Sequence, residues 1–300
     1  MASAELQAIK ENLMQFKRQM AAGVTIPAEA IADLRASNDA TVMLPYDHPV
    51  LSGVRCEEGE LGGTAGEWAR VADEPTKKVL LYFHGGGYEN GTVKSRRLAS
   101  MGIAKVAGID SFSLDYTQWP EGRHPVALNE ALAAWHELVG RYGAENIYMG
   151  GESAGAMLTL ATCLWLSDHG EELPAKILCI GPVIDVSEDL PSQERNNDID
   201  PMLSKGINEQ IRSHYFEGAD PKGPYVSARY GNYEGFPPVM VTVGTEEILY
   251  DDACMLHEIL KEAGVDSTLR IYEECYHTFQ LLPCPEAFAS IEELGEFLKD

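Results

Sequence analysis

From about residue 75 onward, short runs typical of buried strands alternate with stretches of helical periodicity. The expected strands are 79–83, 111–114, 146–149, 177–180, 239–243 and 268–272. The expected helices span roughly 94–107, 125–142, 154–168, 250–263 and 285–299. Such alternation predicts an α/β fold with a mostly parallel central sheet and helices on both faces. A hairpin of 50–57 and 67–72, with a glycine-rich turn over 61–66, is expected to precede it.

Two segments do not fit this alternation. Residues 182–237 separate two strands by far more chain than a crossover needs. We expect this insertion, with a helix near 204–216, to lie over the carboxyl ends of the strands, where open α/β sheets bind ligands. In the first 37 residues, apolar side chains such as Leu6, Ile9 and Leu13 recur at helical spacing, which predicts two helices. Spacing alone leaves open whether these helices are a packed terminus or a lid.

The charge balance excludes several kinds of partner. The 300 residues carry 23 Lys and Arg against 47 Asp and Glu, for a net charge of −24. This balance argues against binding to nucleic acid or to an anionic membrane surface. No run approaches the roughly 18 apolar residues of a membrane span, and the N-terminus lacks the apolar stretch of a secretory signal. The six cysteines show no metal-ligand spacing, so we expect reduced thiols, a cytoplasmic protein and no metal.

The sequence Gly151-Glu152-Ser153-Ala154-Gly155 lies between an expected strand and an expected helix. In this context the pattern G-x-S-x-G is typical of a nucleophile elbow, a sharp turn that exposes the serine hydroxyl. An ordinary glycine-rich turn is the alternative interpretation. We take Ser153 as the candidate nucleophile.

A second glycine motif, His84-Gly85-Gly86-Gly87, directly follows the strand expected at 79–83. Successive glycines leave backbone N–H groups free to point at a ligand, and such groups form the oxyanion hole of serine hydrolases. Gly85, Gly86 and Ala154 are the predicted donors. No G-K-[ST] sequence follows, which disfavours a phosphate-binding loop.

The candidate base and acid come from the C-terminal third of the chain. His277 lies after the last expected strand, where the order serine, acid, histidine requires the base. The acid should follow the strand at 239–243, and Glu246 is the first choice, with three rivals. The rivals are Glu247, Asp251 and Asp252, whose alternative role is to place negative charge in the first turn of a helix.

With these motifs, the chain resembles the hormone-sensitive-lipase-type esterases of the α/β-hydrolase fold over roughly residues 75–300. The motifs are H-G-G-G at 84–87, G-E-S-A-G at 151–155, D-Y-x-x-x-P-E at 115–121, G-T-E-E-I-L-Y-D-D at 244–252 and H-T-F at 277–279. The resemblance implies an α/β-hydrolase fold with an N-terminal helical cap. It also implies Ser153 as nucleophile, His277 as base and an oxyanion hole from Gly85, Gly86 and Ala154. We therefore expect one domain over 1–300, with 1–40 and about 182–237 as the cap.

Three positions depart from the family pattern. Glu246 stands where the family usually has Asp, Glu152 stands where it mostly has Asp or Thr, and Thr117-Gln118-Trp119 replaces the usual Arg-Leu-Ala. The longer Glu246 side chain changes the reach to His277, and residues 117–119 are expected to alter the support beneath the site.

The expected activity is hydrolysis of small neutral carboxylic esters with short to medium acyl chains, through an acyl-enzyme and without a cofactor. Acetyl esters and lactones are among the candidate substrates. A receptor or interaction protein on a hydrolase scaffold, or an amidase or peptidase, are the alternatives. The expected apolar pocket residues are Tyr88, Trp119, Met157 and Phe279, which are equally well read as core. The resemblance also keeps a homodimer open.

Acidic residues are concentrated near the candidate base. Residues 240–300 hold 14 acidic and three basic side chains, and Glu273 and Glu274 stand just before His277. Nearby carboxylates favour the imidazolium form of a histidine. We therefore expect the pKa of His277 to lie at or above its ordinary value, and activity to be highest at neutral to alkaline pH.

Overall fold

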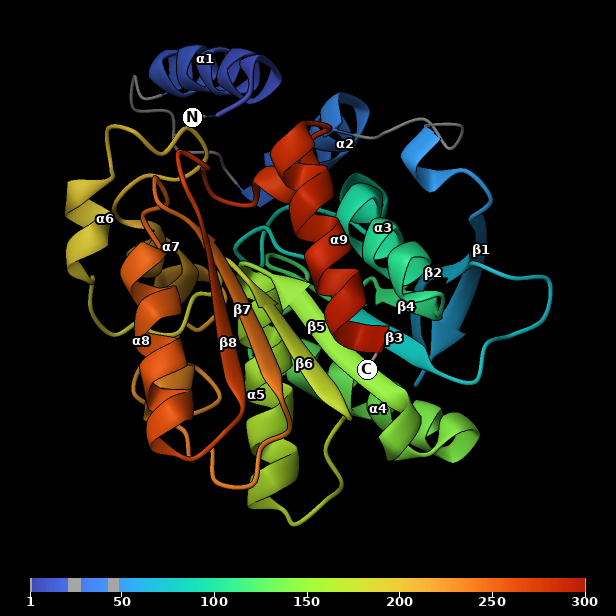
Figure 1. The fold of residues 1–300 in the computed structure, drawn as a ribbon. Coiled ribbons are helices and arrows are strands. Elements are labelled where there is room, and N and C mark those ends of the chain that lie inside the picture. The colour runs from blue at the N-terminus through green and yellow to red at the C-terminus, as the bar shows by residue number, and fades with distance from the viewer. Residues whose placement is uncertain (1, 21–27, 43–48, 300) are drawn as a thin grey trace.

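The computed structural model describes residues 2–20, 28–42 and 49–299. These residues form an eight-stranded sheet in the order β1-β2-β4-β3-β5-β6-β7-β8 (Figure 1). The strands are β1 Arg55–Leu61, β2 Thr64–Arg70, β3 Val79–Phe83, β4 Asp110–Leu114, β5 Ile147–Glu152, β6 Lys176–Ile180, β7 Val239–Gly244 and β8 Ser267–Tyr272. The β1–β2 hairpin joins β4 in antiparallel fashion, and β4, β3, β5, β6, β7 and β8 pair in parallel. The predicted α/β fold with a mostly parallel sheet is confirmed.

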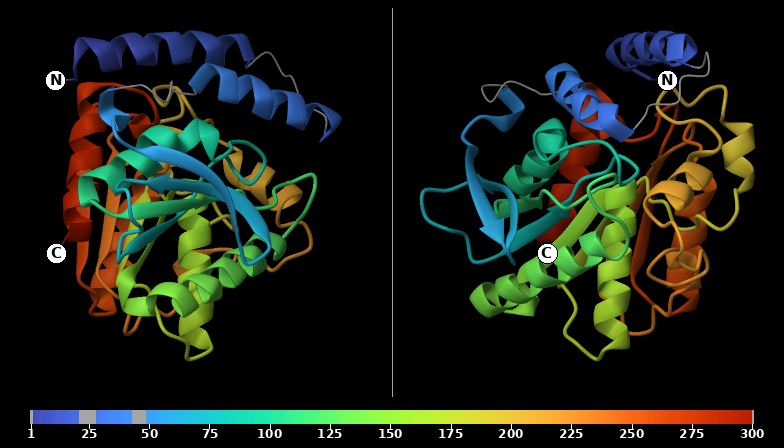
Figure 2. Two further views of the ribbon diagram at one scale, coloured as in Figure 1. Left: turned by 90° about the vertical axis from the view of Figure 1, so that its right-hand side faces the viewer. Right: turned by 180° about the vertical axis from the view of Figure 1, so that it is seen from behind.

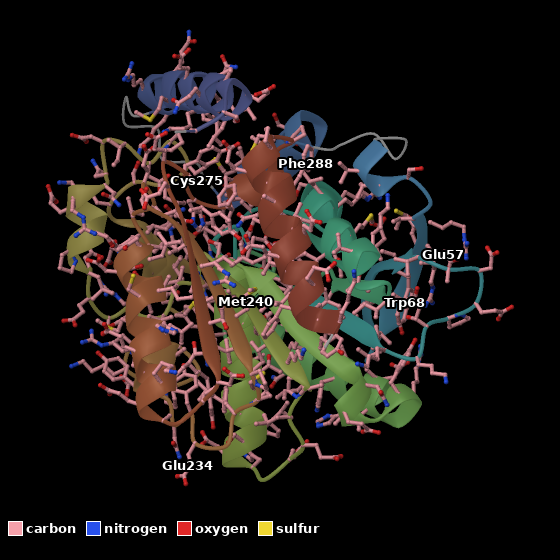
Figure 3. The ribbon with its side chains drawn as sticks, viewed as in Figure 1. Glu57, Trp68, Glu234, Met240, Cys275 and Phe288 are labelled. Atoms are coloured by element: carbon pink, nitrogen blue, oxygen red, sulfur yellow. The ribbon has the colours of Figure 1, made fainter. Side chains whose placement is uncertain are left out.

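Helices cover both faces of the sheet, and each face has its own apolar cluster. On one face, α3 (Arg97–Ala107) and α9 (Pro285–Lys299) pack over side chains such as Leu80 and Met240 (Figures 2 and 3). On the other face, α4 (Val126–Tyr142), α5 (Ala154–Asp168) and α8 (Tyr250–Glu262) enclose a larger cluster. Strand β3 has five apolar residues in succession and all five are buried, as expected for a parallel strand covered on both sides.

The β1–β2 hairpin differs from the sequence prediction. The turn is formed by Gly62 and Gly63 alone, both with positive φ. Leu61 and residues 64–66, which were expected in the turn, therefore belong to the strands. Residues at positive φ suit a two-residue hairpin connection, which fixes the register of the two strands.

The cap segments lie at the carboxyl ends of the strands. Helix α1 (Ala4–Met20) lies across the top of the molecule in Figure 1, and α2 (Ile31–Val42) packs against the short turn Lys94–Arg96. The insertion contributes α6 (Pro191–Arg195) and α7 (Ile207–His214). Residues 21–27, which belong to the expected cap, lie outside the described residues. No described helix is both long enough and apolar enough to cross a bilayer. All six cysteines are free thiols.

Candidate active site

Ser153 forms the sharp turn between β5 and α5. Its backbone has φ 55° and ψ −122°, a strained conformation for a residue with a side chain. The turn is tight because the chain passes very close to β3. A Cβ on Gly151 would lie 2.3 Å from the carbonyl oxygen of Phe83, and one on Gly155 would lie 2.0 Å from it. The glycines of G-x-S-x-G are therefore required by backbone packing, and the geometry is that of a nucleophile elbow.

His277 lies in the loop after β8, and its partner is Glu247. The Nδ1 atom of His277 is 2.8 Å from Oε2 of Glu247, and both side chains are almost fully buried. The other carboxylate oxygen of Glu247 accepts a hydrogen bond from the Gly244 amide at 2.6 Å. Because both oxygens are held, the carboxylate fixes the orientation of the imidazole.

The choice of Glu246 as the partner of His277 is wrong. Its carboxylate lies 2.5 Å from Lys10 Nζ of α1, on the outer side of the loop. The Gly244–Glu247 segment forms a turn in which the Glu247 N–H donates to the Gly244 carbonyl. Neighbouring side chains in such a turn point in different directions. Glu246 therefore points toward α1, and Glu247 points inward to His277.

The other two rivals serve the insertion. Asp251 accepts hydrogen bonds from the Ser192 amide and from Arg195. Asp252 accepts the Ile184 amide at 3.1 Å, and burial raises the pKa of its carboxyl to about 8. Both side chains tie the start of the insertion to α8.

Gly181, the residue after β6, makes room for the histidine–glutamate pair. A Cβ at this position would lie 2.8 Å from Glu247 Oε2 and 3.1 Å from His277 Nδ1. Its φ of 51° also suits glycine better than other residues. Sequence reasoning missed this residue, although its place at the carboxyl end of a central strand was a usable signal.

The charges around His277 favour its protonated form. Burial alone lowers the pKa of this histidine, but the hydrogen bond and charge of Glu247, with the charges of Asp200 and Glu152, outweigh burial and raise it. Burial also raises the pKa of Glu247, and His277 partly offsets that effect. The raised pKa of His277 thus comes from buried carboxylates rather than from Glu273 and Glu274.

The oxyanion donors differ from the prediction at one position. The Gly85 amide is 2.5 Å from Oε1 of Glu152 and donates to it, so the assignment of Gly85 is corrected. Gly86 and Gly87 line the cavity beside Ser153, and their N–H groups have no hydrogen-bond acceptor among the described residues. Ala154 is the first residue of α5, where backbone N–H groups have no partner within the helix. Gly86, Gly87 and Ala154 are thus the available donors.

Glu152 connects the two glycine motifs. Its carboxylate binds the Gly85 amide and lies 2.9 Å from Nε of Arg96. Burial raises the pKa of Glu152, and the charge of Arg96 only partly offsets this. Glu152, which stands where the family mostly has the shorter Asp or Thr, therefore holds the H-G-G-G loop against the elbow.

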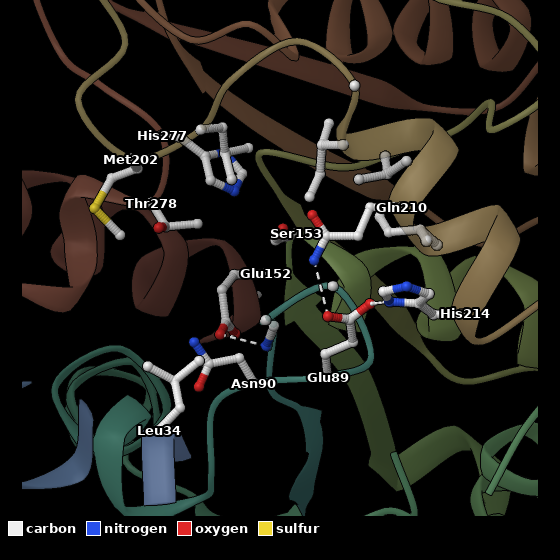
Figure 4. A pocket seen from close by; sticks show the side chains of 18 of the residues that line it. Leu34, Glu89, Asn90, Glu152, Ser153, Met202, Gln210, His214, His277 and Thr278 are labelled. Carbon is white, nitrogen blue, oxygen red and sulfur yellow. Dashed lines mark hydrogen bonds and ion pairs between the residues drawn. The ribbon is translucent and has the colours of Figure 1, made fainter. Parts of the chain in front are cut away.

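A cavity of about 640 Å³ opens above Ser153 and His277 (Figure 4). Its apolar lining comes from the cap and the loops near the base: Ile31, Leu34, Val183, Met202, Leu203, Ile207, Ile211 and Leu281. Its polar lining includes Glu89, Gln210 and His214. Among the described residues no group of His, Cys, Asp or Glu is arranged to hold a metal ion.

The four expected pocket residues do not line this cavity. Tyr88 is buried and stacks on Tyr215, with ring centroids 4.3 Å apart. Met157 belongs to the core beneath the sheet, and Phe279 packs in the cluster that receives Leu6 of α1. Trp119 stacks on the far side of His214, with ring centroids 4.3 Å apart. The prediction failed because much of the apolar lining comes from the cap. Helical spacing predicts the cap helices, but it does not show which of their side chains reach the site.

Comparison with known proteins places this geometry in a family. A family model described as alpha/beta hydrolase fold matches residues 80–281. An acetyl-hydrolase of Streptomyces hygroscopicus is 32% identical over 243 residues, which is 80% of this chain and 81% of that protein. A putative acetyl-hydrolase of Mycobacterium tuberculosis is 28% identical over 82% of this chain and 81% of its own length.

Solved structures agree over nearly the whole chain. An esterase from the bacterial hormone-sensitive lipase family superposes with a TM-score of 0.89 at 31% identity, covering 100% of this chain and 99% of that one. An esterase/lipase from an uncultured bacterium gives a TM-score of 0.90 at 30% identity, covering 99% and 98%. With its serine elbow, buried histidine–glutamate pair and glycine loop, the chain belongs to the α/β-hydrolase family, in the branch of the hormone-sensitive-lipase-type esterases.

Proposed function

We propose that this protein is a serine carboxylic-ester hydrolase that works through an acyl-enzyme. The observation that supports this most is the meeting of Ser153, His277 and the Gly86–Gly87 loop at one cavity, with Glu247 bound behind the histidine. The names of the similar proteins, which include acetyl-hydrolase, esterase and acetyl esterase, support the same reaction.

The proposed first step forms the acyl-enzyme. In the proposed tautomer, the Nδ1–H group of His277 donates a hydrogen bond to Glu247. The Nε2 atom is then free to accept the Ser153 proton. The serine Oγ attacks the ester carbonyl carbon, and the oxyanion is stabilised by the N–H groups of Gly86, Gly87 and Ala154. The N-terminus of α5 adds positive potential at the same point. His277 then returns the proton to the leaving alcohol.

In the second step, water replaces the alcohol. His277 Nε2 takes a proton from water, and the hydroxide attacks the acyl carbonyl. The tetrahedral intermediate collapses, the Ser153 Oγ leaves and regains its proton from His277, and the carboxylic acid is released. Atoms and charges balance without a metal or an organic cofactor.

The preferred substrates are proposed to be neutral esters with short to medium acyl chains. Side chains of α2 and of the insertion line the cavity, whose volume of about 640 Å³ favours shorter chains, and carboxylates of Glu89, Glu152 and Glu209 line it as well. Acetyl esters agree with the names of two similar proteins, an acetyl-hydrolase and an acetyl esterase.

A series of p-nitrophenyl esters from acetate to laurate tests this function. We expect kcat/KM to be highest at two to six carbons and to fall steeply beyond about eight, and Ser153→Ala to abolish turnover while retaining the native circular dichroism spectrum. Wild-type-like activity of the Ser153→Ala variant, or no hydrolysis of any ester in the series, would reject the proposal.

A further inference from the structure

Glu89 is a buried carboxylate in the cavity that the mechanism above does not use. It lies two residues after Gly87, and its side chain is only 8% exposed. One oxygen accepts a hydrogen bond from His214 Nδ1 at 2.5 Å, and the other accepts one from Gln210 Nε2 at 2.8 Å. Both partners come from α7 of the insertion. These three side chains, called here the polar wall, line the cavity (Figure 4).

The polar wall lies on the acyl side of the serine. His277 must protonate the leaving alcohol, so the alcohol lies beside the histidine and the acyl chain extends away from it. In Figure 4, His277, Thr278 and Met202 lie on one side of Ser153, and Glu89 and His214 lie on the other. The acyl chain of a bound ester is therefore directed toward Glu89.

The path from the serine to the polar wall begins as an apolar surface. Ile207 and Ile211 of α7 line the cavity next to the H-G-G-G loop. A Cβ on Gly87 would lie 3.8 Å from Ile211 Cγ1 and 4.0 Å from Ile207 Cδ1. Because the acyl carbonyl binds at this loop, the first carbons of the acyl chain meet these two isoleucines before they reach Glu89.

The carboxylate of Glu89 has unused acceptor capacity. Two carboxylate oxygens can accept about four hydrogen bonds, and the described residues supply two side-chain donors. An alkyl chain placed against such a group displaces water without replacing its hydrogen bonds, which is unfavourable. A hydroxyl group on the acyl chain donates to the carboxylate and removes this penalty.

A neutral donor fits this wall better than an ammonium group. Arg35 donates to the Glu89 carbonyl oxygen at 2.9 Å, and His214 occupies one of the carboxylate oxygens. The Arg35 guanidinium thus already places positive charge beside Glu89. We propose that the polar wall selects short acyl groups that carry a hydroxyl group over plain alkyl groups of the same length. This inference rests on the esterase function proposed above.

The test compares p-nitrophenyl butyrate with p-nitrophenyl 3-hydroxybutyrate, which share one leaving group and differ only on the acyl side. For the wild type we expect kcat/KM to be about tenfold or more higher for the hydroxylated ester, as for one charge-assisted hydrogen bond. In Glu89→Leu this ratio is expected to fall at least tenfold, to one or below. In Glu217→Leu, which removes a carboxylate that is 63% exposed just beyond α7, the ratio should stay as in the wild type.

Glu89→Gln keeps the size of the side chain and carries the test if Glu89→Leu does not fold. We expect its ratio to lie at least threefold below that of the wild type, with an unchanged circular dichroism spectrum. Equal ratios in the wild type and in the Glu89 variants, or a wild-type preference for butyrate, would overturn the inference while leaving the esterase function intact. Failure of the wild type to hydrolyse either ester would instead count against the esterase function itself.

Discussion

Glu246 and Glu247 are neighbours in the chain, but they perform different tasks. Glu247 orients His277 from a buried position, whereas Glu246 forms an ion pair with Lys10 of α1. Removing the charge of a group that fixes a catalytic tautomer reduces turnover far more than removing one partner of a partly exposed ion pair. The two residues therefore provide a matched pair of variants.

We predict that Glu247→Gln lowers kcat by about 10³–10⁴-fold, because an amide presents the wrong hydrogen-bonding group to His277 Nδ1. Glu246→Gln should change kcat by less than about fivefold, the range expected for a partly exposed ion pair. Steady-state hydrolysis of p-nitrophenyl acetate measures both. If Glu246→Gln is the damaging change, the assignment of the acid is wrong.

At the scale of elements, α1 holds the loops that carry the acid and the base. Lys10 pairs with Glu246 and donates to the Glu274 carbonyl, so it bridges the loops after β7 and β8. Lys17 donates to the carbonyl oxygens of Asn197, Asp200 and Leu203, at 2.8, 2.6 and 2.5 Å. The Asp200 carboxylate in turn accepts the Ile248 amide, next to Glu247.

We predict that Lys17→Met lowers both stability and activity, because three carbonyl groups lose a charged donor and the loop beside Glu247 loosens. The melting temperature should fall by roughly 2–4 °C, and kcat/KM for p-nitrophenyl acetate by several-fold. Arg18→Met removes the same charge from an exposed position of the same helix and serves as the control. Equal effects of the two changes would argue against the anchoring role of Lys17.

The strands, the elbow and the base could be predicted from the sequence because each depends on local pattern. Buried parallel strands read as apolar runs, and a serine elbow needs glycines at fixed spacing. The identity of the acid depends on which way a short turn directs neighbouring side chains, which no periodic pattern encodes. The lining of the cavity comes from the cap, where residues such as Ile31 and Met202 are brought together only by tertiary packing.

The pH dependence of activity depends on buried charges that come from several parts of the molecule. The net charge is −24, but the carboxylates that act on His277 are Glu247, Asp200 and Glu152, which are buried around it. Together they raise the pKa of His277 against the opposing effect of burial. Only neutral His277 can accept the serine proton, so activity must rise as pH increases through this raised pKa.

We predict that kcat/KM at pH 5.5 is at most about a tenth of its alkaline plateau, as expected for a base with a pKa at or above 6.5. Glu273→Gln should not move the acidic limb of the profile, because Glu273 is not among the charges that raise the pKa of His277. A pH–rate profile on a neutral ester measures both. Full activity near pH 5 would contradict the assigned environment of His277.

In the proposed mechanism, Ser153 is a nucleophile activated by the His277–Glu247 pair. The most direct measurement is mass spectrometry of the protein after reaction with a fluorophosphonate, which transfers a phosphonyl group to an activated serine with loss of fluoride. We predict one adduct per chain on the peptide that contains Ser153, none in Ser153→Ala, and much slower labelling in Glu247→Gln than in Glu246→Gln. An unlabelled wild-type protein, or an adduct on another residue, would contradict the claim.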